Sequence, residues 1–289
     1  MERMKELIRL LNEAAKAYYQ ESREIMPNYE YDRLYDELEE LERKTGITLS
    51  NSPTIRVGYE VLSDLPKEKH PKKMLSLDKT KDVGALAAWL GSQEGVLSWK
   101  LDGLTIVLTY EEGKLAKAVT RGNGEIGEVI TSNARTFENL PLAIDFKGEL
   151  VLRGEAVISY ADFEKINDEI TDEGAKYKNP RNLCSGSVRQ LNNEITAQRH
   201  VQFFAFSLVS ADGVEFKTRN EQFDWLAERG FQVVEHVSVN AKTISDAVSA
   251  FEAKIADNPV PSDGLVLSYN DIEYGRSLGE TAKFPRDSI

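Results

Sequence analysis

The sequence is poor in cysteine and in histidine. Its 289 residues contain one cysteine, Cys184, and three histidines, His70, His200 and His236. A single cysteine excludes an intrachain disulfide framework and a multi-cysteine zinc site, so we expect no zinc here. The histidines are far apart in sequence and lack His-x-x-His spacing, which argues against a histidine metal site. Cys184 has no histidine near it, and we expect a small buried side chain rather than a nucleophile.

Long apolar runs and an excess of positive charge are also missing. No stretch approaches the ~20 apolar residues of a membrane span. The opening MERMKELIRLL mixes charges into its apolar pattern, which is typical of an amphipathic helix and not of a signal peptide. We therefore expect a cytoplasmic protein without a membrane partner. The net charge of −12 has the wrong sign for a chain that holds nucleic acid alone, unless a local basic groove or a further domain provides the contact.

The N-terminal part predicts a helical hairpin. Apolar residues recur at helical spacing over 2–20 and again over 31–41. Asn28 is the predicted N-cap of the second helix, and Gly46 is its predicted end. A connector rich in proline, serine, asparagine and lysine follows over 47–73.

The remaining residues predict mixed strands and helices. Residues 96–124 predict two strands joined at Glu112-Gly113, because apolar and polar residues alternate on both sides of that turn. Further strands are predicted within 149–160, 201–210, 231–239 and 263–271, and helices at 80–91, 160–170, 218–230 and 243–256. Because strict β-α-β alternation is missing, the pattern favours an α+β fold with largely antiparallel sheets.

Lys100 lies inside an alternating stretch, LSWKLDGLTIVLTY, at residues 97–110. In the simpler interpretation it stands on a solvent-facing edge, where its aliphatic stem lies along the sheet and its charge reaches water. In the other interpretation it is a nucleophile, and an amine attacks only when deprotonated, which desolvation or nearby positive charge favours. Asp102 would share its strand face, and Gly103 would let a ligand or another segment approach the backbone closely.

Polar residues of suitable chemistry follow in order: Arg121, Glu155, Arg181, Arg189 and Asp263. Guanidinium groups suit phosphates, whereas carboxylates suit ribose hydroxyls and Mg²⁺. Together with the lysine they predict a site that attacks a nucleotide phosphorus. Each of them alone is weak evidence, because Arg121 and Glu155 are also explained as surface ion pairs, and Arg181 and Arg189 as solvated charges.

Seven ordered blocks carry a family resemblance. They are YDRLYDELEELE, HPKKMLSLDKT, WKLDGL, VTRGNGEIGEVITSNARTFENLP, LRGEAV, NPRNLCSGSVRQL and SDGLVLSYND with LGETAKFPR. In this order they resemble the adenylation region of bacterial NAD⁺-dependent DNA ligases over essentially the whole chain. The resemblance implies a helical subdomain and connector at 1–69 that binds nicotinamide mononucleotide (NMN). It also implies a covalent-nucleotidyltransferase (ATP-grasp-like ligase) domain at 70–289, with mainly antiparallel sheets and flanking helices.

The resemblance also implies a reaction. Lys100 would attack the α-phosphorus of NAD⁺, expel NMN and hold AMP. The AMP would then pass to the 5′-phosphate of a nick in double-stranded DNA, and the 3′-hydroxyl would displace it. Mg²⁺ would offset the phosphate charge. The implied partners are NAD⁺, AMP, NMN and, for the full-length enzyme, nicked DNA, with the protein acting as a monomer.

Site residues are implied position by position. The catalytic set is Lys100, Asp102 and Asp263. The nucleotide-binding set is Ser76, Leu77, Ser98, Leu101, Arg121, Glu155 and Ser268. The NMN-binding set is Tyr18, Tyr19, Asn28, Tyr31 and Asp32, although Tyr18 and Tyr31 are equally well explained by packing between the hairpin helices. DNA phosphates would meet Arg181 and Arg189, and transient Mg²⁺ would lie near Asp102, Glu155 and Asp263.

Several positions depart from the family pattern. Ser98 replaces a glutamate that meets adenine, and Ser268 replaces a lysine near the α-phosphate. Tyr19 and Asn28 replace a histidine and an aspartate. Lys283 is a candidate replacement for the missing lysine only because it lies near Ser268 in the chain. Because the sequence stops at KFPRDSI, where family members continue, we expect an adenylation fragment.

Two other functions compete with this one. An ATP-using covalent nucleotidyltransferase would share the lysine chemistry, but it would not need the N-terminal hairpin. A weakened nucleotide- or DNA-binding module would be compatible with the two serine replacements.

Overall fold

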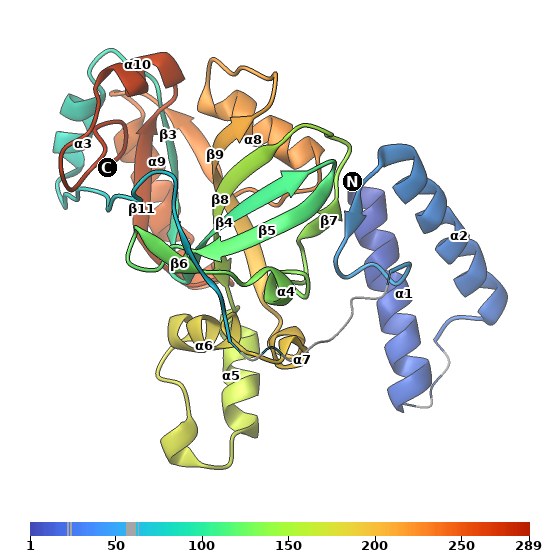
Figure 1. Cartoon of the computed structure of the whole chain (residues 1–289). Coiled ribbons are helices and arrows are strands. Elements are labelled where there is room, and N and C mark those ends of the chain that lie inside the picture. The colour runs from blue at the N-terminus through green and yellow to red at the C-terminus, as the bar shows by residue number, and fades with distance from the viewer. Residues whose placement is uncertain (22, 24, 56–61, 63) are drawn as a thin grey trace.

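The computed structural model describes residues 1–21, 23, 25–55, 62 and 64–289, without the side chains of 18–21 and 28. A helical hairpin at the N-terminus lies beside a body built on two antiparallel sheets and a short two-stranded ribbon (Figure 1). The expected α+β class is confirmed. Among the described residues, no helix is long and apolar enough to cross a membrane.

The hairpin consists of α1 (Glu2–Glu21) and α2 (Asn28–Thr45), as the helical spacing predicted. Leu7, Leu11 and Leu38 are buried between the two helices. The prediction of Asn28 as the N-cap is wrong, because Asn28 already has helical geometry and the extended residue before it is Pro27. Gly46 ends α2 as predicted, with a left-handed backbone (φ 67°) and its N–H donated to the Glu42 carbonyl at 2.8 Å.

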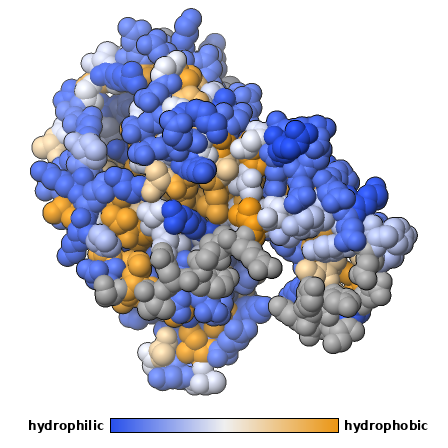
Figure 2. All heavy atoms as spheres, turned by 45° about the vertical axis from the view of Figure 1, so that its right-hand side comes forward, coloured by the Kyte–Doolittle hydropathy of each residue, from blue (hydrophilic) through white to orange (hydrophobic). Residues whose placement is uncertain are grey.

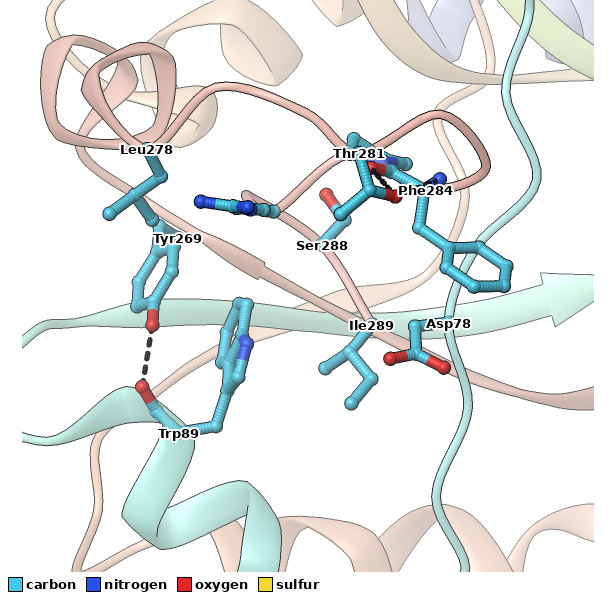
Figure 3. A pocket seen from close by; sticks show the side chains of 10 residues that line it. Asp78, Trp89, Tyr269, Leu278, Thr281, Phe284, Ser288 and Ile289 are labelled. Atoms are coloured by element: carbon cyan, nitrogen blue, oxygen red, sulfur yellow. Dashed lines mark hydrogen bonds between the residues drawn. The ribbon is translucent and has the colours of Figure 1, made fainter.

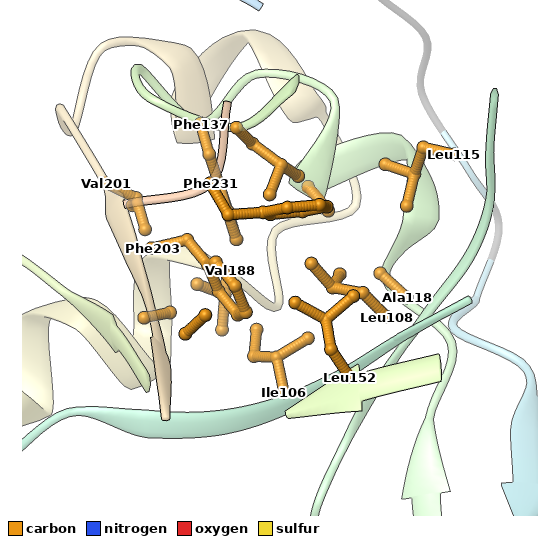
Figure 4. Packing of buried hydrophobic residues seen from close by; sticks show 14 of the residues in the cluster. Ile106, Leu108, Leu115, Ala118, Phe137, Leu152, Val188, Val201, Phe203 and Phe231 are labelled. Carbon is orange, nitrogen blue, oxygen red and sulfur yellow. The ribbon is translucent and has the colours of Figure 1, made fainter. Parts of the chain in front are cut away.

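The larger sheet has six strands in the order β1-β7-β5-β4-β8-β9. Their bounds are β1 (Thr48–Leu49), β4 (Leu104–Glu111), β5 (Lys114–Thr120), β7 (Pro141–Ala143), β8 (Leu150–Val157) and β9 (Gln202–Ala211). Figure 4 shows Ile106, Leu108, Leu152 and Phe203 packing into the core on one face of this sheet. The helices of this part are α4 (Thr131–Ala134), α5 (Tyr160–Glu169), η1 (Glu173–Ala175), α6 (Pro180–Ser187), α7 (Asn193–Ala197) and α8 (Arg219–Glu228).

The smaller sheet has three strands, β10 (His236–Val239), β3 (Gly95–Leu101) and β11 (Ser262–Tyr269), in that order. A second core lies on one face of it and contains Leu97, Trp99 and Leu267. The remaining helices are α3 (Val83–Leu90), α9 (Ile244–Ala253), η2 (Ile255–Asp257) and α10 (Ile272–Ser277), and the ribbon pairs β2 (Lys67–Lys69) with β6 (Ile126–Glu128).

The stretch predicted as one strand through Lys100 is two strands in different sheets. β3 ends at Leu101 in the smaller sheet, and β4 starts at Leu104 in the larger one. At the break, the Asp102 N–H donates to the Pro261 carbonyl at 2.8 Å. A Cβ on Gly103 would lie 1.9 Å from the Ala156 carbonyl oxygen, so only glycine fits against β8. β3 is buried on both faces from Gly95 to Trp99, whereas β4 alternates between buried and partly exposed residues. The apolar pattern of the sequence continues across the break and conceals it.

Other expectations match the structure more closely. The helices predicted at 80–91, 160–170, 218–230 and 243–256 correspond to α3, α5, α8 and α9. The sequence analysis missed α6, although Asn179 caps it by accepting from the Asn182 N–H at 2.8 Å and Pro180 opens it. Cys184 on α6 is fully buried, as expected. The surface view in Figure 2 shows mostly hydrophilic residues, with apolar residues gathered on the body beside the hairpin.

Candidate active site at the junction of the two sheets

Lys100 stands near the end of β3, opposite Gly264 of β11. Its Nζ donates to Asp263 Oδ1 at 2.6 Å. The side chain is 45% exposed, so the amine is ion-paired and hydrated rather than desolvated as nucleophilic chemistry led us to expect. Attack by an amine requires a free electron pair on the nitrogen. Asp263 is the carboxylate that already accepts a hydrogen bond from it.

Asp102 makes its ion pair with a different cation. It lies beyond the end of β3, and its Oδ1 accepts from Arg181 at 3.1 Å. Of the two aspartates expected beside Lys100, Asp263 is therefore its direct partner. The Asp102–Arg181 pair instead joins the strand break to the first turn of α6.

Glu155 of β8 is buried, with 9% of its surface exposed. One carboxylate oxygen accepts from the Gly103 N–H at 3.1 Å, and the other accepts from the Thr105 hydroxyl at 2.8 Å. Burial raises the pKa of Glu155 to about 7, although these hydrogen bonds and the charges of Lys100 and Arg181 act in the opposite direction. The explanation of Glu155 as a surface ion pair is therefore wrong.

Thr105 is a site residue that the sequence analysis missed. It lies on β4 directly opposite Glu155 of β8. In the sequence, Thr105 is visible only as a polar position in the alternating pattern of β4. Thr105 and Glu155 are 50 positions apart in the chain, and the pairing of β4 with β8 brings them together.

Arg121 links the connector to the larger sheet. Its guanidinium donates to the Met74 carbonyl at 3.3 Å and to the Ser76 hydroxyl at 3.2 Å. Leu77, the next residue, is half-buried. Arg153 of β8, which was not predicted, lies close enough that burial and the charge of Arg121 lower its pKa. Among the described residues neither arginine has a carboxylate partner within 4.0 Å, which makes this part of the site attractive to an anion.

Ser98 and Ser268 lie on the face of the smaller sheet that carries Lys100. Ser98, 9% exposed, stands opposite His236 on β10 and Val266 on β11. Ser268 shares a hydroxyl–hydroxyl hydrogen bond of 2.8 Å with Ser288. Leu101 packs against the second core, on the other face.

The remaining predicted residues lie farther out. Arg189 pairs with Glu128 at 2.7 Å, and Lys283 is exposed in a turn. In the hairpin, Tyr31 packs partly against the helical core, with its ring centre 6.3 Å from that of Tyr35, and Asp32 is exposed. The predicted roles of Tyr18, Tyr19 and Asn28 depend on side chains outside the described residues.

A cavity of about 320 Å³ lies at the other end of the smaller sheet, where Tyr269 of β11 pairs with Gly95 at the start of β3 (Figure 3). Trp89 and Tyr269 form one wall, with stacked rings whose centres are 3.9 Å apart, and the Tyr269 hydroxyl donates to the Trp89 carbonyl. Phe284 and Ser288 line it as well, and so does Asp78, which follows Ser76-Leu77. Its walls therefore adjoin residues expected to lie against a nucleotide.

The carboxylates do not form a closed metal cage. Within the described ranges, no group of three or more histidine, cysteine or acidic side chains converges to hold a metal ion. Asp102 and Asp263 are each paired with a cation. Proteins often hold Mg²⁺ through one or two carboxylates together with substrate phosphates, and these residues fit only that arrangement.

Two antiparallel sheets meet at Lys100, with buried Glu155 next to it, an arrangement that suits a nucleotidyltransferase domain. Residues 62–289 match the family described as NAD-dependent DNA ligase adenylation domain. Residues 1–58 match the family described as DNA ligase-like, N-terminal NAD⁺-binding domain. The chain therefore belongs to the NAD-dependent DNA ligase adenylation domain family.

Curated relatives agree with this assignment. The chain is 65% identical over 287 residues to a DNA ligase of Ruminiclostridium cellulolyticum, covering 99% of this chain and 44% of that protein. It is 63% identical over 289 residues to a DNA ligase of Lachnoclostridium phytofermentans, covering 100% and 44%. The chain thus spans less than half the length of these relatives. Among solved structures, an archaeal ATP-dependent RNA ligase matches 70% of this chain and 46% of its own at 13% identity, with a TM-score of 0.44, too low to support an argument.

Proposed function

We propose that this chain transfers AMP from NAD⁺ to Lys100 as the first step of DNA nick sealing. The observation that carries the proposal is the Lys100 amine, held by Asp263 at the junction of the two sheets, next to buried Glu155. The proton leaves Nζ, a bond forms between Nζ and the α-phosphorus of NAD⁺, and the bond from that phosphorus to NMN breaks. The product is lysyl-AMP, a phosphoramidate, and NMN leaves with the electron pair.

The protein groups of the site have two roles in this proposal: some position the reacting atoms, and others attract the charged nucleotide. Asp263 aims the amine and receives its proton. Glu155 binds the ribose hydroxyls, with Thr105 and the Gly103 N–H holding its carboxylate in place. Arg121 attracts the nucleotide because no carboxylate among the described residues neutralises it.

We assign nucleotide binding on this side to Ser76, Leu77, Ser98, Leu101 and Ser268. Ser98 offers a small hydroxyl where the family pattern has a glutamate that meets adenine. Ser268 offers one where the family pattern has a lysine near the α-phosphate, so this chain would meet both groups with neutral side chains. Asp102 acts on the same site through Arg181.

The hairpin serves the other half of NAD⁺. We assign residues 1–69 to the NMN-binding subdomain and its connector, with the NMN contacts in the hairpin, and residues 70–289 to adenylate transfer. Tyr18, Tyr19, Asn28, Tyr31 and Asp32 would surround the nicotinamide ribonucleotide. An aromatic face attracts the positively charged nicotinamide ring, and an acidic side chain offsets its charge.

Mg²⁺ supplies charge neutralisation on the phosphates when it is bound. Asp102, Glu155 and Asp263 are the groups that would face it, with the substrate phosphates completing its coordination. Nicked DNA is the acceptor in the longer enzyme, and Arg181 and Arg189 would bind its phosphates. We further assign the protein to the cytoplasm and expect it to act as a monomer.

The test is an intact-mass measurement. The chain is incubated with Mg²⁺ and either NAD⁺ or ATP, alongside Lys100→Ala and the matched control Lys242→Ala, whose lysine is exposed in the turn before α9. One added adenylate from NAD⁺ alone, absent in Lys100→Ala and retained in Lys242→Ala, is the expected result.

Other outcomes each identify an alternative. An adduct from ATP alone would assign the chain to ATP-using nucleotidyltransferases. An adduct that persists in Lys100→Ala would place the nucleophile elsewhere. No adduct from either donor, in a chain extended past Ile289, would leave a nucleotide- or DNA-binding module.

A further inference from the structure

The outer face of the β2–β6 ribbon carries two exposed lysines, on a chain whose net charge is −12. Lys67 and Lys69 are exposed and lie on the same face of β2, because side chains alternate along a strand. Neither has a carboxylate within 4.0 Å in the part of the chain that the structure describes. Between them Glu68 points to the other face and pairs with Lys117 at 2.5 Å.

The ribbon that presents these lysines is firmly attached to the larger sheet. Lys67 and Lys69 pair antiparallel with Glu128 and Ile126. The Val129 N–H donates to the Pro66 carbonyl at 2.7 Å. Buried His70, just after β2, places Nε2 3.1 Å from the Thr120 carbonyl at the end of β5. The two ammonium groups therefore stand on an anchored strand, and a binding partner need not order the backbone first.

The neighbours of these lysines keep the face positive. Glu128, opposite Lys67, uses its carboxylate on Arg189 at 2.7 Å. Ile126, opposite Lys69, leaves 45% of its surface exposed beside the charge. A surface of cations and a small apolar group suits a sugar–phosphate backbone, which offers anionic oxygens next to less polar sugars.

The ribbon also adjoins the two arginines assigned to DNA phosphates. Arg181 lies in the first turn of α6, and Arg189 follows the end of this helix, which Figure 1 shows below β6. The two arginines therefore lie near opposite ends of α6, whose last residue is Ser187. The Arg189–Glu128 bond then joins this helix to the ribbon.

We propose that Lys67 and Lys69 extend this line of cations and bind DNA phosphates on the side of α6 away from Lys100. The contact is sequence-independent and tolerates any duplex of suitable length. The proposal rests on the proposed function only in taking DNA as the ligand, and it requires no adenylate transfer.

The test compares two double variants with the same change in charge. Lys67→Gln with Lys69→Gln removes the ribbon cations, and Lys217→Gln with Lys242→Gln removes two exposed lysines elsewhere. Binding of the whole chain to a labelled, 5′-phosphorylated nicked duplex is followed by fluorescence anisotropy from low salt upward. Two lost phosphate contacts should reduce the slope of log K against log salt by about 1.8, and affinity near 0.1 M salt by about one to two orders of magnitude.

Several results would overturn a role of Lys67 and Lys69 in DNA binding. Equal losses in both double variants would reduce the effect to net charge and overturn the proposal. An unchanged slope in the ribbon variant, or no duplex binding by the unsubstituted chain at low salt, would overturn it as well. If the glutamine pair unfolds, Lys67→Arg with Lys69→Arg must keep the slope. Adenylation from NAD⁺, measured in parallel, should be unchanged, and its absence would refute the proposed function without touching this result.

Discussion

Lys100 Nζ lies 2.6 Å from Asp263 Oδ1, although 163 positions separate the two residues in the chain. The pair is formed between β3, the central strand of the smaller sheet, and β11, near the end of β3. The hydrogen bond fixes the position of the amine, and in the proposed reaction the same carboxylate would aim Lys100 and accept its proton.

Asp263→Asn should slow adenylation by NAD⁺ about 10²–10⁴-fold, the usual contribution of a positioned proton acceptor. The variant retains shape and hydrogen bonding but loses the charge. Single-turnover formation of the adduct measures the rate, with Asp257→Asn in exposed η2 as the control. A rate within threefold of the unsubstituted chain would show that Asp263 takes no part in the chemical step.

Glu155→Gln should change how stability depends on pH. The native pKa of Glu155, about 7, exceeds the usual 4.5 of a glutamic acid, so the native state binds more protons between these values than the unfolded state does. The stability contributed by the protonated Glu155 side chain is fully present below pH 4.5 and is lost as the pH rises through about 7. The resulting decrease in the free energy of unfolding is at most about 3 kcal/mol. A glutamine at this position does not titrate, so the variant does not show this decrease.

Urea unfolding at pH 5 and pH 8 measures this effect. The gain of Glu155→Gln over the unsubstituted chain should be larger at pH 8. Exposed Glu149→Gln serves as the control and should show no such difference. An equal offset at both pH values would mean that the native carboxyl titrates normally.

Gly103→Ala should destabilise the fold by more than about 3 kcal/mol, because strain against a neighbouring backbone is among the severe effects of substitution. A Cβ there would meet the Ala156 carbonyl oxygen at 1.9 Å, so β8 or the strand break must move. Gly174→Ala is the matched control, since its nearest atom is Asp172 Oδ1 at 3.3 Å. Chemical denaturation measures both, and similar midpoints would contradict the close approach.

Asp32→Ala should weaken NAD⁺ binding and leave AMP binding unchanged, because only NAD⁺ contains the NMN half. Asp32 is exposed on α2, so its removal should alter stability by less than about 0.5 kcal/mol. Calorimetric titration with both nucleotides separates the halves, and Glu30→Ala, two residues earlier on the helix, is the control. Equal losses for NAD⁺ and AMP would assign Asp32 a structural role.

The sequence predicted more of the local structure than of the contacts. The hairpin followed from helical periodicity, and Gly46 from the need for a left-handed residue at a helix end. The strand break at Gly103 could not be predicted, because apolar alternation continued through it. Thr105 was missed for a related reason: its role depends on the partner strand, which periodicity does not identify.

The sequence by itself determined the chemical groups of this protein: Lys100 within an alternating stretch, the ordered arginines and carboxylates, and the helical hairpin before them. Only the tertiary structure decided which groups meet. It paired Lys100 with Asp263 and gave Asp102 to Arg181, and it buried Glu155 enough to raise its pKa. The physical reason is that periodicity reports burial along one segment, whereas ion pairs and desolvation depend on how distant segments pack in space.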